Sequence, residues 1–419
     1  MNYQFGIEEE HFVVNADSGH IRSRADECFM ARVTTLSDGA IKPELLQSQI
    51  ELATPVCTGS AEARQHLVGL RVLIDETGQP FGRTLLAAGT HPTAAWLHQK
   101  LTPKDRYEPV TRDMQMLTCR NLICGMHVHV EIPDPDLRID VMNRAIPFLP
   151  LFLALSASSP FWQRRTSGYA SYRMTSYQEW PRTGLPPQFA TWQSYRGYVD
   201  TLIASRIIPD PSYIWWAIRP SSKYPTLELR VCDTCTSIDD AVAIASLYRC
   251  LVKFLVENRA FKSPLGSNTL ALAKENLWRT QRFGLDARLV DPFGVEKTTT
   301  ASASCRRLLR RVRRDAESLG CLAEIGHIET ILHRGNSADH QLHIFENATA
   351  AGATSRQALR QTLHWLLAGS VPVVDNDQVP GTPQMTTRTA PKATAADLVT
   401  STISKPATGS LCLDNSGLG

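Results

Sequence analysis

The sequence predicts an α+β fold in which a curved, mainly antiparallel sheet lines a charged site with one face and packs its back face on helices. Four β-like segments recur along the chain, each with carboxylate, histidine or arginine side chains on one face and apolar side chains on the other. Apolar-periodic helix signals follow them. An antiparallel sheet of this kind exposes one face to solvent while its back face packs on helices.

The composition is that of a soluble globular protein. The chain has 419 residues, 43% of them apolar, and its 44 basic and 41 acidic side chains leave a net charge of +3, too small to indicate a nucleic-acid or membrane partner. The apolar run Phe148–Leu155 is far shorter than the roughly 20 residues that cross a bilayer. The N-terminus, MNYQFGIEEE, lacks the features of a signal peptide. We therefore expect a cytoplasmic protein whose ten cysteines are free thiols.

A change in composition predicts the domain boundary. Trp365 is the last aromatic residue, and residues 371–419 contain eight threonines and five prolines. Such a stretch buries too little apolar surface to offset the entropy of ordering it. We predict one folded domain over residues 1–370 and a Thr/Pro-rich flexible tail over residues 371–419.

Alternation of polar and apolar residues predicts the strands. Phe5–Val14, the segment around Glu51, Asn121–Ile132 and Thr226–Cys232 each have this pattern or are rich in β-formers. The last of them alternates strictly, and its apolar face consists of Leu227, Leu229 and Val231.

Two helices are expected in the second half of the chain. Ser237-x-x-Asp240 is a capping-box pattern that opens the apolar run Ala241–Val256. Cys305–Leu322 has an apolar stripe at helical spacing and six arginines. The arginines invite a nucleic-acid interpretation, but no aromatic residues are interleaved for base stacking, so a solvent-facing helix surface is favoured.

Three consecutive glutamates lie in the first predicted strand. Because side chains alternate, Glu8 and Glu10 share a face roughly 7 Å apart, while Glu9 points away. A divalent cation with oxygen ligands, Mg²⁺ or Mn²⁺, would relieve their repulsion. The alternative is an exposed edge strand whose charges oppose aggregation. Glu44 and Glu51, near the second strand, are further acidic candidates.

Two histidines share a face of the third predicted strand. His127, His129 and Glu131 alternate with valines packed behind them. His-x-His on a strand is a common metal geometry, although two histidines are as often structural polar groups. The complement of a closed zinc site is missing, and Cys232-x-x-Cys235 has no matching second pair.

A carboxylate and a guanidinium project together from the fourth strand. Glu228 and Arg230 lie opposite the apolar face, which indicates either a structural salt bridge or a metal-binding carboxylate beside an arginine for a phosphoryl group. Arg219 and Lys223 add cations upstream. No Gly-rich phosphate loop of Walker or Rossmann type is present, so a nucleotide would be held through metals and cations.

Seven ordered blocks identify a resemblance that covers about residues 3–368. They are FGIEEE, QSQIELATPVC, AGTHP, GMHVHV, ALSASSPFW, IRPSSKYPTLELRVCDT and NLWRTQRFGLDA. Together they resemble the carboxylate–amine ligase family, the type 2 glutamate–cysteine ligases of bacteria. The resemblance implies a catalytic domain similar to those of glutamine synthetase and guanido kinases, with ATP and metals on the concave face of the sheet. It also suggests a homodimer.

The resemblance implies ATP-dependent amide synthesis. A carboxylate, glutamate in the leading hypothesis, attacks the γ-phosphate of ATP, and an amine, cysteine or another, displaces the acyl phosphate. The implied cofactors are ATP and Mg²⁺, with Mn²⁺ as a substitute. By motif, Arg230 and Glu228 are implied in catalysis, and the metal ligands are Glu8, Glu10, Glu44, Glu51, His127 and Glu228. Arg219 is implied in substrate or nucleotide binding, and Lys223 and His129 are added as nucleotide-binding candidates.

Two alternatives stay open. The same sheet would serve a phosphotransferase acting on a guanidino group, and a non-catalytic protein would only bind the metal or nucleotide. The intact pairs Glu8/Glu10 and Glu228/Arg230 favour an enzyme over a binding protein.

Overall fold

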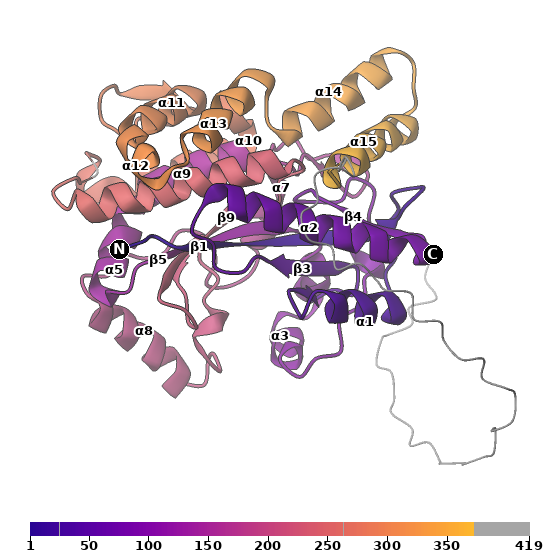
Figure 1. The fold of residues 1–419 in the computed structure, drawn as a ribbon, viewed down its shortest axis with the longest axis horizontal. Helices are drawn as coiled ribbons and strands as arrows, with labels where there is room; N and C mark the ends of the chain where they lie inside the picture. The colour runs from indigo at the N-terminus through magenta and orange to yellow at the C-terminus, as the bar shows by residue number, and fades with distance from the viewer. Residues whose placement is uncertain (25, 263, 373–419) are drawn as a thin grey trace, which may run out of the picture. The chain divides into compact units, whose positions relative to one another are not determined.

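In the computed structural model, which describes residues 1–24, 26–262 and 264–372, a seven-stranded sheet organises the chain (Figure 1). Its strand order is β2-β3-β1-β5-β9-β8, and β4 pairs with the far end of β1. Every pairing in it is antiparallel. The strands are β1 (Phe5–Asn15), β2 (Ile41–Pro43), β3 (Gln49–Ala53), β4 (Arg83–Leu86), β5 (Gly125–Glu131), β8 (Ile218–Pro220) and β9 (Thr226–Asp233).

Helices and two short ribbons complete the described part of the chain. The ribbons pair β6 (Phe161–Trp162) with β7 (Arg165–Thr166) and β10 (Arg288–Val290) with β11 (Thr298–Thr300). The α-helices are α1 (Glu27–Leu36), α2 (Ser60–Gly78), α3 (Tyr107–Met114), α4 (Met116–Arg120), α5 (Pro135–Ala145), α6 (Leu149–Ser156), α7 (Tyr172–Tyr177), α8 (Trp192–Ala204), α9 (Ile238–Glu257), α10 (Thr269–Phe283), α11 (Ala301–Arg311), α12 (Arg313–Leu319), α13 (Leu322–Arg334), α14 (Ser337–Ala350) and α15 (Ser355–Ser370).

The hydrophobic core lies between one face of the sheet and its helices. Figure 1 shows α9 and α2 running along that face, with α13 outside α9. The apolar side chains of β9 point into this layer and are fully buried, and the hydroxyl of Tyr248 on α9 donates to the Leu227 carbonyl at 3.3 Å. The other face of the sheet carries the acidic and cationic side chains of the candidate site, among them Glu8, Glu10, Glu228 and Arg230. The predicted α+β fold with an antiparallel sheet and flanking helices is confirmed.

The helix predictions are correct in part. α9 begins after Ser237, but the Ser237 side chain makes no capping hydrogen bond, and Asp240 instead accepts a hydrogen bond from His327 at 2.8 Å. The single helix predicted over Cys305–Leu322 is wrong. The chain turns between α11 and α12, and Gly320 then takes a left-handed conformation, φ +65°, that ends α12 before α13 starts.

The arginines of α11 and α12 mostly have partners in the protein. Arg307 pairs with the buried Asp291 at 2.6 Å, and Arg306 pairs with Glu329 at 2.9 Å. Residues Pro135–Ser156 are long and apolar enough to cross a membrane by length and composition, but 89% of that window is buried inside the protein. Such burial is typical of a core segment of a soluble protein. The predicted flexible tail lies outside the described residues, apart from residues 371–372.

Candidate active site

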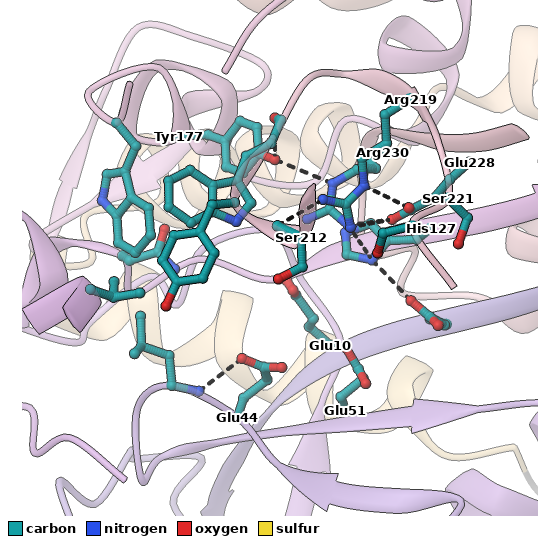
Figure 2. Close-up of a pocket in the computed structure, with 18 of the residues that line it drawn as sticks. Glu10, Glu44, Glu51, His127, Tyr177, Ser212, Arg219, Ser221, Glu228 and Arg230 are labelled. Carbon is teal, nitrogen blue, oxygen red and sulfur yellow. Dashed lines mark hydrogen bonds and ion pairs between the residues drawn. The ribbon is translucent and has the colours of Figure 1, made fainter. Parts of the chain in front are cut away.

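A cavity of about 320 Å³ opens on the polar face of the sheet. The residues predicted from the sequence as catalytic, metal-binding or nucleotide-binding all line it: Glu8, Glu10, Glu44, Glu51, His127, His129, Arg219, Lys223, Glu228 and Arg230. Figure 2 shows two groups in it, with Glu10, Glu44 and Glu51 on one side and His127, Glu228, Arg219 and Arg230 on the other. Residues separated by more than 200 positions therefore meet because β1, β3, β5 and β9 are neighbours in the sheet.

Strand register brings the acidic group together. Glu10 on β1 pairs across the strands with Glu51 on β3, and the amide of Gly125 on β5 donates to the Glu10 carboxylate at 2.6 Å. Burial and the nearby Glu44 carboxylate raise the pKa of Glu10 to about 7. Burial and the carboxylates of Glu44 and Glu8 raise the pKa of Glu51 well above its usual range. The raised pKa values show that the cations of the protein do not fully compensate the burial and mutual repulsion of these carboxylates.

Glu8 sits between two imidazoles on β5. Its carboxylate lies 3.4 Å from His127 Nδ1 and 3.5 Å from His129 Nε2. Burial raises the pKa of Glu8, but these two contacts outweigh it and hold the pKa below its usual range. Burial and Arg230 lower the pKa of His127 to about 4, so this imidazole is neutral at pH 7. The Nε2 atom of His127 is buried without a hydrogen-bond partner, and that of His129 is buried with only the Glu8 contact.

Glu228 lies between two guanidinium groups. Arg219 Nε donates to it at 2.7 Å, and Arg230 Nη1 donates to its other oxygen. Burial raises the pKa of Glu228, but Arg219 and Arg230 outweigh burial and hold the pKa well below its usual range. Glu228 is only 2% exposed, so its carboxylate lies deep in the floor of the cavity.

A bulge in β9 aims Arg230 at this site. Met126 on β5 pairs with Cys232 and Val128 with Leu229, so two residues of β9 lie opposite His127. Arg230 Nη1 lies 3.4 Å from His127 Nδ1, and its Nε donates to the Tyr177 hydroxyl at 3.4 Å. Glu228 and Arg230 nevertheless both line the cavity while Leu227, Leu229 and Val231 lie in the core, as the predicted alternation requires.

The donor set along the cavity floor suits divalent cations. Among the described residues, three groups in this cavity each place ligand atoms within 4.8 Å of one another: Glu8 with His129 and Glu228, Glu8 with Glu51 and His127, and Glu10 with Glu44 and Glu51. Carboxylate-rich donor sets are typical of Mg²⁺ and Mn²⁺ rather than of structural zinc. The unpartnered Nε2 atom of His127 and the crowded carboxylates both fit a bound cation.

Arg219 and Lys223 differ in how far each is engaged by other groups of the protein. Arg219 uses most of its donors within the protein, on Glu228 and on the Ser212 carbonyl at 3.1 Å. Lys223 is exposed at the cavity rim, with its Nζ 4.9 Å from the centre of the Tyr224 ring. Lys223 is therefore the freer of the two cations to meet a ligand.

The sequence interpretation missed Arg173, which also lines the cavity. Its side chain on α7 is 1% exposed, and its Nε has no hydrogen-bond partner. Its Nη atoms make only long contacts, with the Arg230 and Val231 carbonyls at 3.4–3.5 Å and with the Met174 sulfur at 3.6 Å. The nearest carboxylate, Asp233, is 4.0 Å away. A Cβ at Gly125 would lie 2.0 Å from Arg173 Nη2, so any larger residue there would displace the guanidinium. In the sequence, Gly125 could have indicated that another side chain packs closely against β5, but not that this side chain is Arg173.

An aromatic wall, defined by five rings and also missed from the sequence, lines another part of the cavity. Tyr177 donates to the Trp215 carbonyl at 2.6 Å, and the rings of Trp180 and Trp215 meet edge to face at 5.0 Å. The wall comes from α3, α7 and the segments before β8, and consists of Tyr107, Tyr177, Trp180, Tyr213 and Trp215.

The fold is similar to that of solved ligases. A crystal structure of glutamate–cysteine ligase from Francisella tularensis in complex with AMP superposes with a TM-score of 0.64 at 13% identity, covering 89% of this chain and 90% of that one. A bifunctional glutathione synthetase from Pasteurella multocida also gives a TM-score of 0.64, at 14% identity, with 88% of this chain and 52% of that one covered. This chain thus spans about half the length of the bifunctional protein.

Sequence comparisons assign the family. A model of glutamate–cysteine ligase family 2 matches residues 4–360. A relative from Rhodospirillum rubrum with the provisional name glutamate–cysteine ligase 2 is 43% identical over 373 residues, 88% of this chain and 96% of the relative. A relative of the same provisional name from Roseiflexus castenholzii is 39% identical over 86% of this chain and 95% of its own length. The chain therefore belongs to glutamate–cysteine ligase family 2, a family of ATP-dependent carboxylate–amine ligases.

Proposed function

We propose that the protein activates glutamate with ATP as an acyl phosphate and joins it to cysteine or another amine, with Mg²⁺ as cofactor and the cytoplasm as its location. The observation that carries the proposal is the row of three donor groups on the cavity floor, flanked by the buried cations Arg230 and Arg173. The AMP bound to the Francisella tularensis ligase, which has the same fold, supports a nucleotide in this cavity.

The metal ions would be held by the three donor groups of the cavity floor. When bound, Mg²⁺ or Mn²⁺ neutralises triphosphate charge and so favours phosphoryl transfer. Glu8 and Glu51 each belong to two of these groups.

Arg230 would neutralise the transferring phosphoryl group in this reaction. Its guanidinium is fixed by Glu228, by the Tyr177 hydroxyl and by contact with His127. A cation fixed in advance needs little reorganisation as charge develops in the transition state. Arg219 holds Glu228 from the other side and acts as its support, while Lys223 and His129 remain our candidates for the nucleotide.

Arg173 is placed to bind a substrate carboxylate. Its buried charge has no bidentate partner, and guanidinium forks pair well with carboxylates. The aromatic wall beside it would exclude water from an acyl phosphate, which hydrolysis would otherwise destroy. In the proposed reaction, a carboxylate oxygen bonds to the γ-phosphorus as ADP leaves. The amine nitrogen then bonds to the acyl carbon as phosphate leaves, and the nitrogen loses a proton.

Hydroxylamine trapping tests the proposal. The full-length protein is incubated with ATP, Mg²⁺, hydroxylamine and a panel of amino acids, and ADP and hydroxamate are measured. Hydroxamate formed with glutamate supports the acyl phosphate. ADP with a phosphorylated guanidino compound and no hydroxamate would instead establish the phosphotransferase. Nucleotide binding without turnover on the whole panel would favour a non-catalytic protein.

A further inference from the structure

A pair of thiols lies in the helical layer behind the sheet, away from the cavity. Cys250 lies on α9 and Cys321 is the residue that precedes α13. Their Sγ atoms are 3.5 Å apart, and both residues are fully buried. A disulfide has a sulfur–sulfur distance of about 2.05 Å, so the two atoms must approach by only about 1.5 Å.

A buried guanidinium faces these thiols. Arg249 is 2% exposed, and it donates to the carbonyls of Tyr3 at 2.7 Å and Thr58 at 2.8 Å. Its Nη1 has no hydrogen-bond partner, and no carboxylate in the described part of the chain forms an ion pair with it. The titratable groups that interact with its charge are three thiols, those of Cys57, Cys250 and Cys321.

This surrounding favours a thiolate on one member of the pair. The hydrogen bond from Cys250 lowers the pKa of Cys321, burial opposes this, and Arg249 lowers it further. The hydrogen bond to Cys321 and burial raise the pKa of Cys250. Thiol oxidation requires an attacking thiolate beside a second thiol, together with access for the oxidant.

We propose that Cys250 and Cys321 form a disulfide when the protein meets a peroxide. The Cys321 thiolate attacks one oxygen of hydrogen peroxide, which breaks the O–O bond and gives a sulfenic acid and hydroxide. The Cys250 sulfur then attacks the Cys321 sulfur, and the sulfenic oxygen leaves as water with the thiol proton. In sum, two thiols and one peroxide give one disulfide and two waters, with two electrons passing from sulfur to oxygen.

The position of Cys250 and Cys321 determines how a disulfide between them would affect the protein. The disulfide joins residues 71 positions apart, across α10 to α12, and so restricts the unfolded chain. The pair lies behind the sheet, on the opposite side from Glu228 and Arg230, so the bond stabilises the fold and leaves the cavity open. The oxidant reaches Cys321 by local opening of the turn at Gly320, where the adjoining Leu322 is 39% exposed.

Peptide mapping of the full-length protein tests the proposal. The protein is treated with hydrogen peroxide, its remaining thiols are alkylated, and non-reduced peptides are analysed by mass spectrometry. We expect a peptide linked through Cys250 and Cys321 that a reductant separates, and a Tm at least about 2 °C above that of the reduced protein. The exposed Cys28 reports that the oxidant acted.

Three variants serve as controls. C250S and C321S should each abolish the linked peptide, whereas C57S, which removes the third thiol near Arg249, should retain it. The proposal is overturned if Cys28 is oxidised while Cys250 and Cys321 both stay alkylatable. It is equally overturned if Cys321 is recovered linked to Cys57. Because the wild-type map alone decides between these results, the test does not depend on any variant folding.

Discussion

Arg71 donates hydrogen bonds to both carboxylate oxygens of Glu9, at 2.9 and 2.7 Å, and both side chains are completely buried. Glu9 points away from the cavity, on the face of β1 opposite Glu8 and Glu10. Arg71 also donates to three backbone carbonyls, those of Cys235 and Thr236 in the segment between β9 and α9 and that of Ser370 at the end of α15. The Arg71–Glu9 pair therefore connects α2, the segment before α9 and the end of α15 to β1, the strand that carries Glu8 and Glu10.

Breaking this pair should be costly. Glu9→Ala leaves the Arg71 charge buried and unpaired, and we expect the free energy of unfolding to fall by about 3–5 kcal/mol. Urea denaturation measures the change. Arg64→Ala is the matched control, because its ion pair with Asp239 is about half exposed and its loss should cost at most about 1 kcal/mol. Equal effects of the two substitutions would contradict the role of Glu9 as a buried anchor.

Glu228→Gln tests the centre of the site. The substitution keeps the shape and one hydrogen-bond acceptor but removes the charge between Arg219 and Arg230, so ADP formation should fall by about 100-fold or more. We choose glutamine because Glu228→Ala would leave two buried guanidinium groups without a partner and would lower stability as well. ADP release and a thermal melt of the same sample separate the two effects. If Glu228→Gln forms ADP at the wild-type rate, Glu228 is not an essential residue of the site.

Gly125→Ala tests the role of Arg173 without changing Arg173 itself. The added methyl group would lie 2.0 Å from Arg173 Nη2 and must displace the guanidinium. If Arg173 binds the substrate carboxylate, kcat/KM for glutamate should fall by about 10- to 100-fold, chiefly through KM. Gly69→Ala is the matched control, since its Cβ meets no atom within 4 Å. A change in kcat with an unchanged KM for glutamate would argue against carboxylate binding by Arg173.

The parts of the site that were predicted from the sequence depend on local alternation. Glu8 and Glu10 share a face because β1 is regular there, and the same holds for His127 and His129 on β5. Period two is a property of the strand itself, so it can be read without knowing the fold. The antiparallel sheet with one polar face follows from the same pattern.

The parts that were missed depend on contacts distant in sequence. Arg173 sits on a six-residue helix, and its guanidinium enters the cavity because Gly125, 48 positions away, leaves room for it. The helix predicted over Cys305–Leu322 is likewise interrupted after Arg311, where the apolar periodicity continues, and it ends at the left-handed Gly320 before α13, which packs along α9. Neither feature leaves a periodic signal in the sequence.

The stability of the protein should fall at acidic pH because His91 is buried in its neutral form. Its Nε2–H donates to the Gly19 carbonyl at 2.8 Å, and its Nδ1 accepts hydrogen bonds from the amides of Thr93 and Ala94. Burial lowers the pKa of His91 to about 4 from 6.5. The unfolded state therefore binds the proton first as pH falls, so this stability is complete above pH 6.5 and is lost between pH 6.5 and 4.

The expected loss from His91 is about 3 kcal/mol over that interval. Urea denaturation at several pH values measures it in the wild type, in His91→Gln and in His98→Gln, whose histidine is exposed. The wild type and His98→Gln should lose stability in parallel, while His91→Gln should show a smaller slope. Parallel slopes in all three proteins would show that His91 is not the group responsible.

The last prediction concerns where the folded domain ends. Ser370, the final residue of α15, accepts from Arg71 Nη1 through its carbonyl at 3.1 Å, and its hydroxyl accepts from the Ala87 amide at 2.8 Å. A chain ending at residue 372 keeps these bonds, and we expect it to retain the activity and Tm of the full-length protein. A chain ending at residue 366 leaves Arg71 short of one acceptor and removes the partner of Ala87, so its Tm should fall by several degrees. Thermal melts and ADP release compare the two truncations with the full chain. Lost activity in the chain ending at 372 would mean that residues beyond it take part in the site, and an unchanged Tm in the chain ending at 366 would show that Ser370 does not anchor α15.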